Sequence, residues 1–404
     1  MWEQIRSNQI RSVILVAAMG ILLLLIGFGL GYVFGGSTTS GIAGLVIALV
    51  IWAVMNLIAY FQGDSLLLSM SKAIKISPDD HPRLYNVVEE MKIASGLPKM
   101  PDVYIIDDPA LNAFATGRDP NKASVAVTSG LLEKLNRDEL EGVIGHEMSH
   151  IKNRDVLLMT ICSVLLGTIV ILAWYGSRAL IFSGGGRRSS KGGGQGQLII
   201  FAVAIVLMIL APIMAQLIYF AISRKREYLA DASSALYTRY PEGLASALEK
   251  LGASTGQLKS ANQATAPMYI VNPFRKQGRA AADLTSTHPP ISERIHILRA
   301  MAGGASYADY DKAYQQVHQG GAGVMPAAAL AGGGAVGLRA APPEATLKKP
   351  EPGRVERTRE VGDLLWQKSG YKIIDCECGT RLKVPSNIGR ATVKCPHCGR
   401  THQI

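Results

Sequence analysis

The chain has 404 residues, 48% of them hydrophobic, and its mean hydropathy is +0.18. This average is too apolar for an ordinary water-soluble protein, so membrane spans are the first feature to look for. The formal net charge of +11 would also suit nucleic-acid binding. Because much of this charge lies beside apolar segments and in the C-terminal tail, affinity for an anionic lipid bilayer explains it better.

Four apolar runs are each close to the ~20 residues that a helix needs to cross the hydrocarbon core of a bilayer. They cover residues 13–34, 42–61, 156–182 and 198–222. The first run is too long for a signal peptide and a second run follows it at once, so we interpret it as an anchor. The turn between these two runs is uncharged, whereas Lys and Arg flank their outer ends. The first hairpin is therefore expected to have both outer ends in the cytoplasm.

The orientation of the second hairpin does not follow from its charges. Arg187, Arg188 and Lys191 lie in its Gly- and Ser-rich loop, while Arg224 and Arg226 follow its second run. We infer the orientation of the second hairpin from the first one. If the chain enters the first span from the cytoplasm, four spans return it to the cytoplasm. An inverted or re-entrant second hairpin stays open as an alternative.

A metal-binding motif, His-Glu-Met-Ser-His, occupies residues 146–150. On a helix this spacing places two imidazoles one turn apart on one face, where they can hold a single zinc ion. Asn136 can cap such a helix. Acidic residues in the first turn and an apolar stripe at helical spacing also favour a helix here. Zinc lowers the pKa of water, and Glu147 is the candidate base that takes the proton. The sequence therefore predicts a metallopeptidase with His146 and His150 as metal ligands.

Two acidic residues after the fourth run are candidates for completing this site. Glu227 and Asp231 are spaced i and i+4, so they share a helix face. Zinc peptidases commonly use two histidines and one glutamate, and ligand histidines usually donate their other N–H to a carboxylate. Glu227 fits the ligand and Asp231 fits the orienting carboxylate. From spacing alone, a solvated charged helix stays an alternative.

Three motifs in order resemble the HtpX family of integral-membrane zinc proteases and, more widely, the CAAX prenyl endopeptidases. They are the motif at 146–150, Ser-Arg-Lys-Arg-Glu-Tyr-Leu-Ala-Asp at 223–231 and Thr-His-Pro-Pro at 287–290. The resemblance covers about the first three quarters of the chain. It implies a cytoplasmic-facing zinc endopeptidase that acts on membrane proteins. It also carries the ligand role to Glu227 and the orienting role to Asp231.

The resemblance implies roles for three further residues. Residues 112–117 look like the edge strand beside the family's cleft, so Asn112 is a candidate for binding the backbone of an extended substrate. His288 resembles a family histidine that could stabilise the oxyanion, although a capping or core histidine is an equal alternative. Arg294 is a candidate partner for a carboxylate of the site.

Four of the five cysteines cluster near the C-terminus, as Cys376-Glu-Cys378 and Cys395-Pro-His-Cys398. Paired knuckles of this kind predict a zinc ribbon with a second, structural zinc held by four thiolates. The first knuckle has one residue between its cysteines instead of the usual two, which leaves an atypical site or another metal open. Disulfides are the alternative, which a cytoplasmic location disfavours.

The predicted fold class is a multipass membrane protein with four transmembrane helices, an α+β, mainly α, gluzincin-like catalytic domain and a small zinc ribbon. A stretch rich in Gly, Ala and Pro before the ribbon predicts a flexible linker. The predicted units are a transmembrane hairpin over 1–65, a catalytic segment over 66–155, a second hairpin over 156–222, a catalytic segment with the third ligand over 223–303, the linker over 304–365 and the ribbon over 366–404.

The expected activity is hydrolysis of peptide bonds in damaged or misfolded membrane proteins, with the protease in the cell membrane and serving quality control. We expect the ribbon to recruit or sense substrate protein, and nucleic-acid binding stays open. The alternative is a membrane-tethered zinc-binding scaffold that acts through its ribbon and has a weakly active peptidase domain. The intact Glu147 argues against that alternative. Processing of one defined partner is a second alternative.

Overall fold

The computed structural model describes residues 2–183, 205, 209, 224–254, 256, 258–259, 268–271, 288–301, 303–331, 334–339, 351–389 and 392–404. Nearly all of the apolar run at 198–222, which the sequence predicts as a fourth span, lies outside these residues. The same holds for most of the loop before that run and for Thr287 of the Thr-His-Pro-Pro motif.

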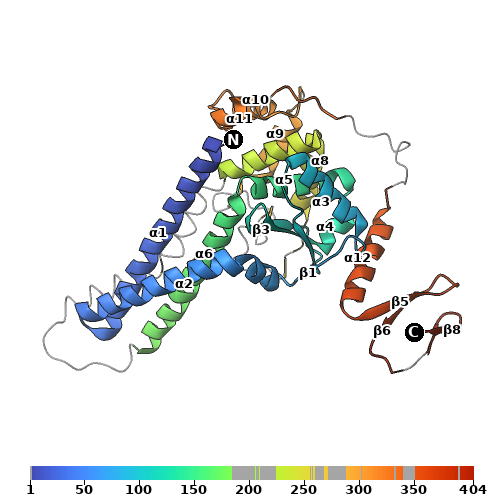
Figure 1. The fold of residues 1–404 in the computed structure, drawn as a ribbon, viewed down its shortest axis with the longest axis horizontal. Coiled ribbons are helices and arrows are strands. Elements are labelled where there is room, and N and C mark those ends of the chain that lie inside the picture. The colour runs from blue at the N-terminus through green and yellow to red at the C-terminus, as the bar shows by residue number, and fades with distance from the viewer. Residues whose placement is uncertain are drawn as a thin grey trace.

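Three helices in the described part of the chain are long and apolar enough to cross a membrane. They are α1 (Trp2–Gly35), α2 (Thr38–Met70) and α6 (Asp155–Ser183), which contain the first three predicted spans. In Figure 1, α1 and α2 form a long hairpin, and α6 crosses it. The hairpin is tight because Gly27 and Gly44 face each other, and a Cβ on Gly44 would collide with the carbonyl of Gly27.

A four-stranded sheet in the order β1-β2-β4-β3 supports the catalytic domain. The strands are β1 (Ala73–Lys75), β2 (Asp102–Ile106), β3 (Ala113–Asp119) and β4 (Lys122–Thr128). Strands β2 and β4 are parallel and the other pairs are antiparallel, so β3 is an edge strand whose register pairs Ala113 with Val127. This mixed sheet among helices agrees with the predicted α+β class.

Helix α5 (Arg137–Lys152) carries the metal-binding motif and runs through the interior of this domain. It begins at a capping box, in which Asn136 and Glu139 satisfy each other's backbone N–H groups. Leu140 and Val143 are fully buried. Gly142 lets α5 approach another helix closely, since a Cβ there would lie 2.6 Å from the backbone nitrogen of Leu244. The neighbouring helices are α3 (Pro82–Ser95), α4 (Ser129–Lys134), α8 (Pro241–Ala253) and α9 (Ile291–Arg299).

The structure corrects the prediction of a flexible linker over 304–365. This stretch contains α10 (Tyr307–Val317), α11 (Ala327–Ala331) and most of α12 (Arg354–Lys368). Tyr310 on α10 is fully buried, and Val361 on α12 is 1% exposed, both within the main hydrophobic core. The prediction from composition was wrong because each of these helices is short and buries only a few apolar residues. The Gly- and Ala-rich stretches between them dominate the average composition of this part of the chain.

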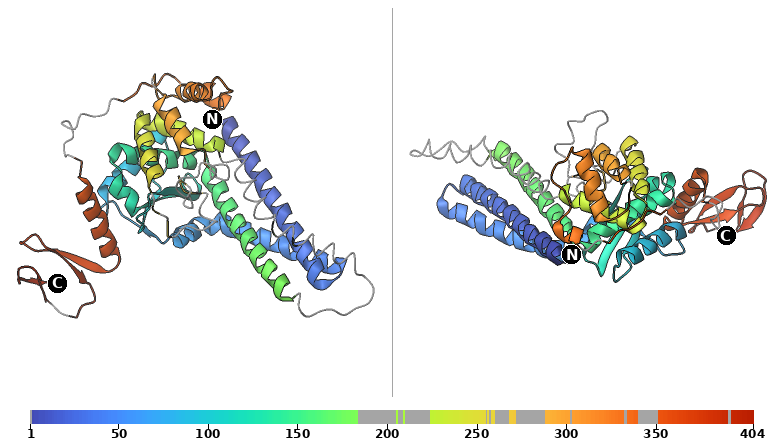
Figure 2. Two further views of the ribbon diagram at one scale, coloured as in Figure 1. Left: turned by 180° about the vertical axis from the view of Figure 1, so that it is seen from behind. Right: turned by 90° about the horizontal axis from the view of Figure 1, so that it is seen from above.

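The C-terminal module is two small hairpins that follow α12. Its strands are β5 (Tyr371–Asp375), β6 (Arg381–Pro385), β7 (Thr392–Lys394) and β8 (Thr401–Gln403), paired β5-β6 and β7-β8. Both views in Figure 2 place this module at the end of the molecule opposite the α1–α2 hairpin. Helix α12 attaches it to the catalytic domain, since Nζ of Lys368 lies 2.7 Å from Oδ2 of Asp80 and Arg357 Nε donates to the carbonyl of Glu133 at 3.0 Å.

The entry to α12 also reaches the beginning of α5. Oε1 of Glu351 accepts a hydrogen bond from the backbone N–H of Arg137 at 2.6 Å, and Nη1 of Arg83 lies 3.4 Å from the same oxygen. A carboxylate at the first turn of a helix is favoured by the positive end of the helix dipole. The stretch before the ribbon therefore helps to hold the N-terminal end of the motif-bearing helix.

Candidate metal centre

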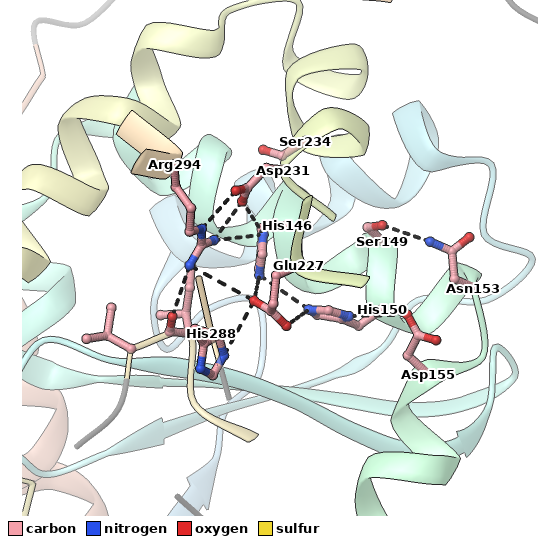
Figure 3. A network of polar contacts seen from close by, with 12 residues as sticks. His146, Ser149, His150, Asn153, Asp155, Glu227, Asp231, Ser234, His288 and Arg294 are labelled. Atoms are coloured by element: carbon pink, nitrogen blue, oxygen red, sulfur yellow. Dashed lines mark hydrogen bonds and ion pairs between the residues drawn. The ribbon is translucent and has the colours of Figure 1, made fainter. Parts of the chain in front are cut away.

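Two elements bring three ligand-type side chains together. His146 and His150 come from α5, and Glu227 comes from the helical residues 224–238. Nε2 of His146 lies 3.5 Å from Oε2 of Glu227, and Nε2 of His150 lies 3.6 Å from Oε1. One ligand atom from each residue lies within 4.8 Å of the others. Figure 3 shows the three side chains pointing toward one another. The structure thus places the three ligands expected from the sequence at one point.

The donor atoms fit a metal ion better than they fit one another. The two Nε2 atoms of His146 and His150 face each other at 3.3 Å. Oε2 of Glu227 is buried and has no hydrogen-bond partner among the groups that the structure describes. A buried carboxylate oxygen without such a partner is costly, and a cation between the three groups would satisfy it. Two imidazoles and one carboxylate form a ligand set typical of zinc.

The side chain of Glu227 is ionised in this environment. Burial by itself would raise the pKa of Glu227, but the neighbouring His288, His146 and His150 together hold that pKa well below its ordinary value. An anionic oxygen pointed at two imidazole nitrogens is a suitable metal ligand. The electrostatics of the site therefore favour binding of a cation.

A buried ion pair holds the other side of His146. Nδ1 of His146 lies 3.0 Å from Oδ1 of Asp231, and Arg294 donates to both oxygens of Asp231 at 2.8 and 2.6 Å. Burial lowers the pKa of His146, but the neighbouring carboxylates of Asp231 and Glu227 outweigh it and raise this pKa to about 9. The sequence expectation pairs Asp231 with a ligand histidine and Arg294 with a site carboxylate, and both contacts occur.

His150 has a comparable pair of partners, which sequence reasoning missed. Its Nδ1 lies 3.4 Å from Oδ2 of Asp155, and Oδ1 of Asp155 lies 3.4 Å from Nη1 of Arg226. All three side chains are buried. The available signal was an aspartate at the very start of an apolar span, five residues after His150, and an arginine directly before Glu227.

Glu147 directly follows the ligand His146 on α5, and it contacts Ala115 of the edge strand β3. It is 1% exposed, and burial raises its pKa although His146 and His150 oppose the rise. A hydrogen bond with the backbone of Ala115 in β3 also opposes it. A glutamate whose pKa is moved toward neutrality is better suited to accept and return a proton.

Asn112, the candidate for binding the backbone of a substrate, pairs with the chain's own backbone in this structure. Its Nδ2 donates to the carbonyl of Val271 at 2.9 Å, and its Oδ1 accepts from the backbone N–H of Ala113 at 3.1 Å. The adjacent Ile270 N–H donates to the carbonyl of Ala113 at 3.0 Å. Asn112 thus binds the chain's own backbone beside β3, because a side-chain amide can pair with a neighbouring peptide group as a strand would.

His288 lies against the ligand carboxylate. Its Nε2 is 3.4 Å from Oε2 of Glu227, and its side chain is 5% exposed. Burial lowers its pKa to about 4, although Glu227 opposes the shift. His288 is therefore a neutral imidazole at neutral pH, placed at the site as the sequence led us to expect, and its ring can donate one hydrogen bond.

A second ligand cluster lies in the C-terminal module. Sγ of Cys376 is 3.4 Å from Sγ of Cys398, and Sγ of Cys378 is 3.7 Å from Sγ of Cys395. All four cysteines are free, and their sulfurs lie within 4.8 Å of one another. This arrangement gathers the four predicted thiolate ligands around one point.

Fold and site together define a membrane metallopeptidase. The model of peptidase family M48 matches residues 78–302. The chain is 46% identical over 300 residues to a protease HtpX homolog of Dictyoglomus turgidum, covering 74% of this chain and 94% of that protein. It is 42% identical over 302 residues to a protease HtpX homolog of Streptococcus uberis, covering 74% of this chain and all of that protein. The chain belongs to peptidase family M48.

Among solved structures, S. mikatae Ste24p is similar to this chain with 21% sequence identity and a TM-score of 0.37. The match covers 74% of this chain and 67% of that one. This similarity is weak, and the assignment to the family rests on the sequence matches. The family match ends at residue 302, so α10, α11, α12 and the cysteine module all lie beyond it.

Proposed function

We propose that this chain is a zinc endopeptidase of the cell membrane that hydrolyses damaged or misfolded membrane proteins, with its site facing the cytoplasm. The observation that carries the proposal is the convergence of His146, His150 and Glu227 beside the buried Glu147. When bound there, zinc would polarise the scissile carbonyl and lower the pKa of water. The side chains around the metal would carry out proton transfer and stabilise the oxyanion.

Glu147 is the proton carrier in the proposed reaction. It takes a proton from the attacking water as the carbon–oxygen bond forms, and it returns a proton to the amine nitrogen as the carbon–nitrogen bond breaks. His288 is positioned to donate a hydrogen bond to the negative oxygen that develops on the substrate. Its lowered pKa favours a neutral imidazole at His288, and such a ring carries one N–H that can donate a hydrogen bond.

The location of the site at the end of a span supports membrane proteins as substrates. Asp155, which contacts His150, is also the first residue of α6 and of its candidate span. A polypeptide emerging from the bilayer would therefore reach the site over a short distance. The cytoplasmic orientation rests on the basic residues that flank the first hairpin and on its uncharged turn.

For the C-terminal module we propose a structural zinc held by Cys376, Cys378, Cys395 and Cys398. Only a few buried residues form the core of this module, so metal binding would supply much of its folding free energy. Its role would be to recruit substrate protein, with nucleic-acid binding as the alternative. If the peptidase domain is weakly active, the chain would be a membrane-tethered scaffold that acts through this module.

Cleavage of an unfolded model protein by detergent-purified, zinc-reconstituted full-length chain tests the proposal. Glu147→Gln should keep the metal and lose the activity, because an amide cannot carry the proton. Glu89→Gln, an exposed acid on α3, is the matched control and should cut like wild type. If wild type and Glu147→Gln cut equally with equal bound zinc, the proposed base is wrong. If no variant cuts any of several unfolded substrates, the scaffold gains support.

A further inference from the structure

Each ligand histidine turns its second ring nitrogen toward a buried aspartate. Nδ1 of His146 lies 3.0 Å from Asp231, which Arg294 holds by two hydrogen bonds. Nδ1 of His150 lies 3.4 Å from Asp155, whose side chain is 1% exposed. An acceptor at Nδ1 keeps the proton on that nitrogen and leaves Nε2 free to bind metal.

The second aspartate is also held by an arginine. Nη1 of Arg226 lies 3.4 Å from Oδ1 of Asp155, and the Arg226 side chain is 8% exposed. The two oxygens of Asp155 therefore divide their roles, with one facing His150 and the other facing Arg226. Each histidine is thus backed by an aspartate and then an arginine, although the contacts behind His150 are longer (Figure 3 shows Asp155 beside His150).

We propose that Asp155 and Arg226 are positioning residues that fix the ring orientation and tautomer of His150 and thereby set the metal affinity of the site. This rests on the proposed function only in taking His146, His150 and Glu227 as metal ligands. Asp155 begins α6, and Arg226 directly precedes Glu227 in the chain. The pair therefore joins the two chain segments that flank the second apolar hairpin of the sequence, and it does so beside the candidate ligand His150.

A purely structural role for Asp155 makes a different prediction. An acidic residue in the first turn of α6 also favours that helix through the helix dipole. Such a role would change stability and leave the affinity for metal unchanged. The two roles are therefore separated by measuring metal affinity at equilibrium, independently of proteolysis.

The experiment measures competition for Zn²⁺ between a chelator and the full-length chain in detergent. Every protein sample carries Glu147→Gln, which prevents self-cleavage. Asp155→Ala should weaken zinc binding at the histidine site by ~10- to 100-fold, as loss of a carboxylate behind a ligand histidine generally does. Asp155→Asn keeps an acceptor oxygen and should lose less. Asp102→Ala, which removes an exposed partner of Lys75, should not change the affinity. The four-cysteine site serves as an internal reference, because its affinity should stay constant.

The second arm tests whether Arg226 acts through Asp155. Arg226→Met alone should weaken zinc binding, and adding it to Asp155→Ala should cause no further loss, since the two act in one chain. Replacing zinc with Co²⁺ distinguishes the two sites, because thiolate ligands give charge-transfer bands that the histidine site lacks. A changed cobalt spectrum at the histidine site in Asp155→Ala would report a reoriented ligand.

Unchanged zinc affinity in Asp155→Asn and Arg226→Met would overturn the proposal, even if stability fell. Should Asp155→Ala not fold, these two variants decide the matter. Wild-type protein that binds no zinc at the histidine site would instead overturn the proposed function, so the two failures are distinguishable. Fully additive losses in the double variant would refute the statement that Arg226 acts through Asp155.

Discussion

Loss of the Arg294 guanidinium should destabilise the catalytic domain more than any surface substitution, because it would leave the buried Asp231 without its arginine partner. Both side chains are fully buried, and Arg294 donates two hydrogen bonds to Asp231 at 2.8 and 2.6 Å and a third to the carbonyl of Ile270 at 3.3 Å. Breaking a buried ion pair from one side typically costs about 3–5 kcal/mol. We expect Arg294→Met to lose an amount in this range.

The compensating substitution makes this prediction sharper. Asp231→Asn removes the charge that Arg294→Met leaves unpaired, so the double variant should recover to within about 1–2 kcal/mol of wild type. Arg294→Lys keeps the charge but cannot present the same planar set of donors. Its stability should therefore lie between that of the double variant and that of Arg294→Met. The expected order of stability is therefore wild type, double variant, lysine variant and methionine variant.

Pulse proteolysis in urea is the assay, with metal-free full-length protein in detergent and Glu147→Gln in every sample. It reports the free energy of unfolding of the soluble part, while the membrane helices stay in the micelle. Glu242→Gln, at an exposed partner of Arg299, is the matched control and should cost about 0–1 kcal/mol. A loss below about 1 kcal/mol for Arg294→Met, or no recovery in the double variant, would refute the reasoning.

Three further predictions concern buried polar groups, each measured as the free energy of unfolding. Burial lowers the pKa of His81 from 6.5 to about 4, so the folded state resists protonation. The free energy of unfolding should therefore fall by about 3 kcal/mol as pH drops from about 6.5 to about 4. His81→Asn, which keeps a cap for α3, should remove this pH-dependent loss. Tyr310→Phe should raise stability by about 1 kcal/mol, because the Tyr310 hydroxyl is buried without a hydrogen-bond partner among the described groups, and a clear loss would contradict this. Asn112→Ala should cost about 1–3 kcal/mol by leaving the backbone groups of Ala113 and Val271 unpaired, whereas Asn121→Ala, at an exposed turn, should be neutral.

The histidine ligands could be predicted because their local spacing in the sequence indicates metal binding. Two histidines four residues apart on a helix share a face whatever the rest of the chain does. Glu227 needed the family resemblance, because a carboxylate on a charged helix has no distinctive local pattern. The cysteines followed from residue type and spacing, like the histidines.

Partners that depend on tertiary packing were not predictable in this way. Nothing in the spacing of Asp155 and Arg226 reveals that they meet, since the contact forms only when two segments some seventy residues apart come together. The same holds for Asn112, whose partner Val271 is 159 residues away. In α10, Tyr310 and Ala313 join the helix to the core, and composition averages over so few residues.

The contact between Glu351 and the backbone of Arg137 bears on how this protein could have acquired its C-terminal quarter. Residues beyond the family match supply a carboxylate to the first turn of the helix that carries His146 and His150, and Val361 and Leu364 fill part of the same interior. An appended module joined only by a tether could be lost again without consequence. Here a deletion at the family boundary would expose apolar surface and remove the carboxylate that accepts the Arg137 N–H of the motif-bearing helix, so the extension and the protease are constrained to evolve as one folding unit.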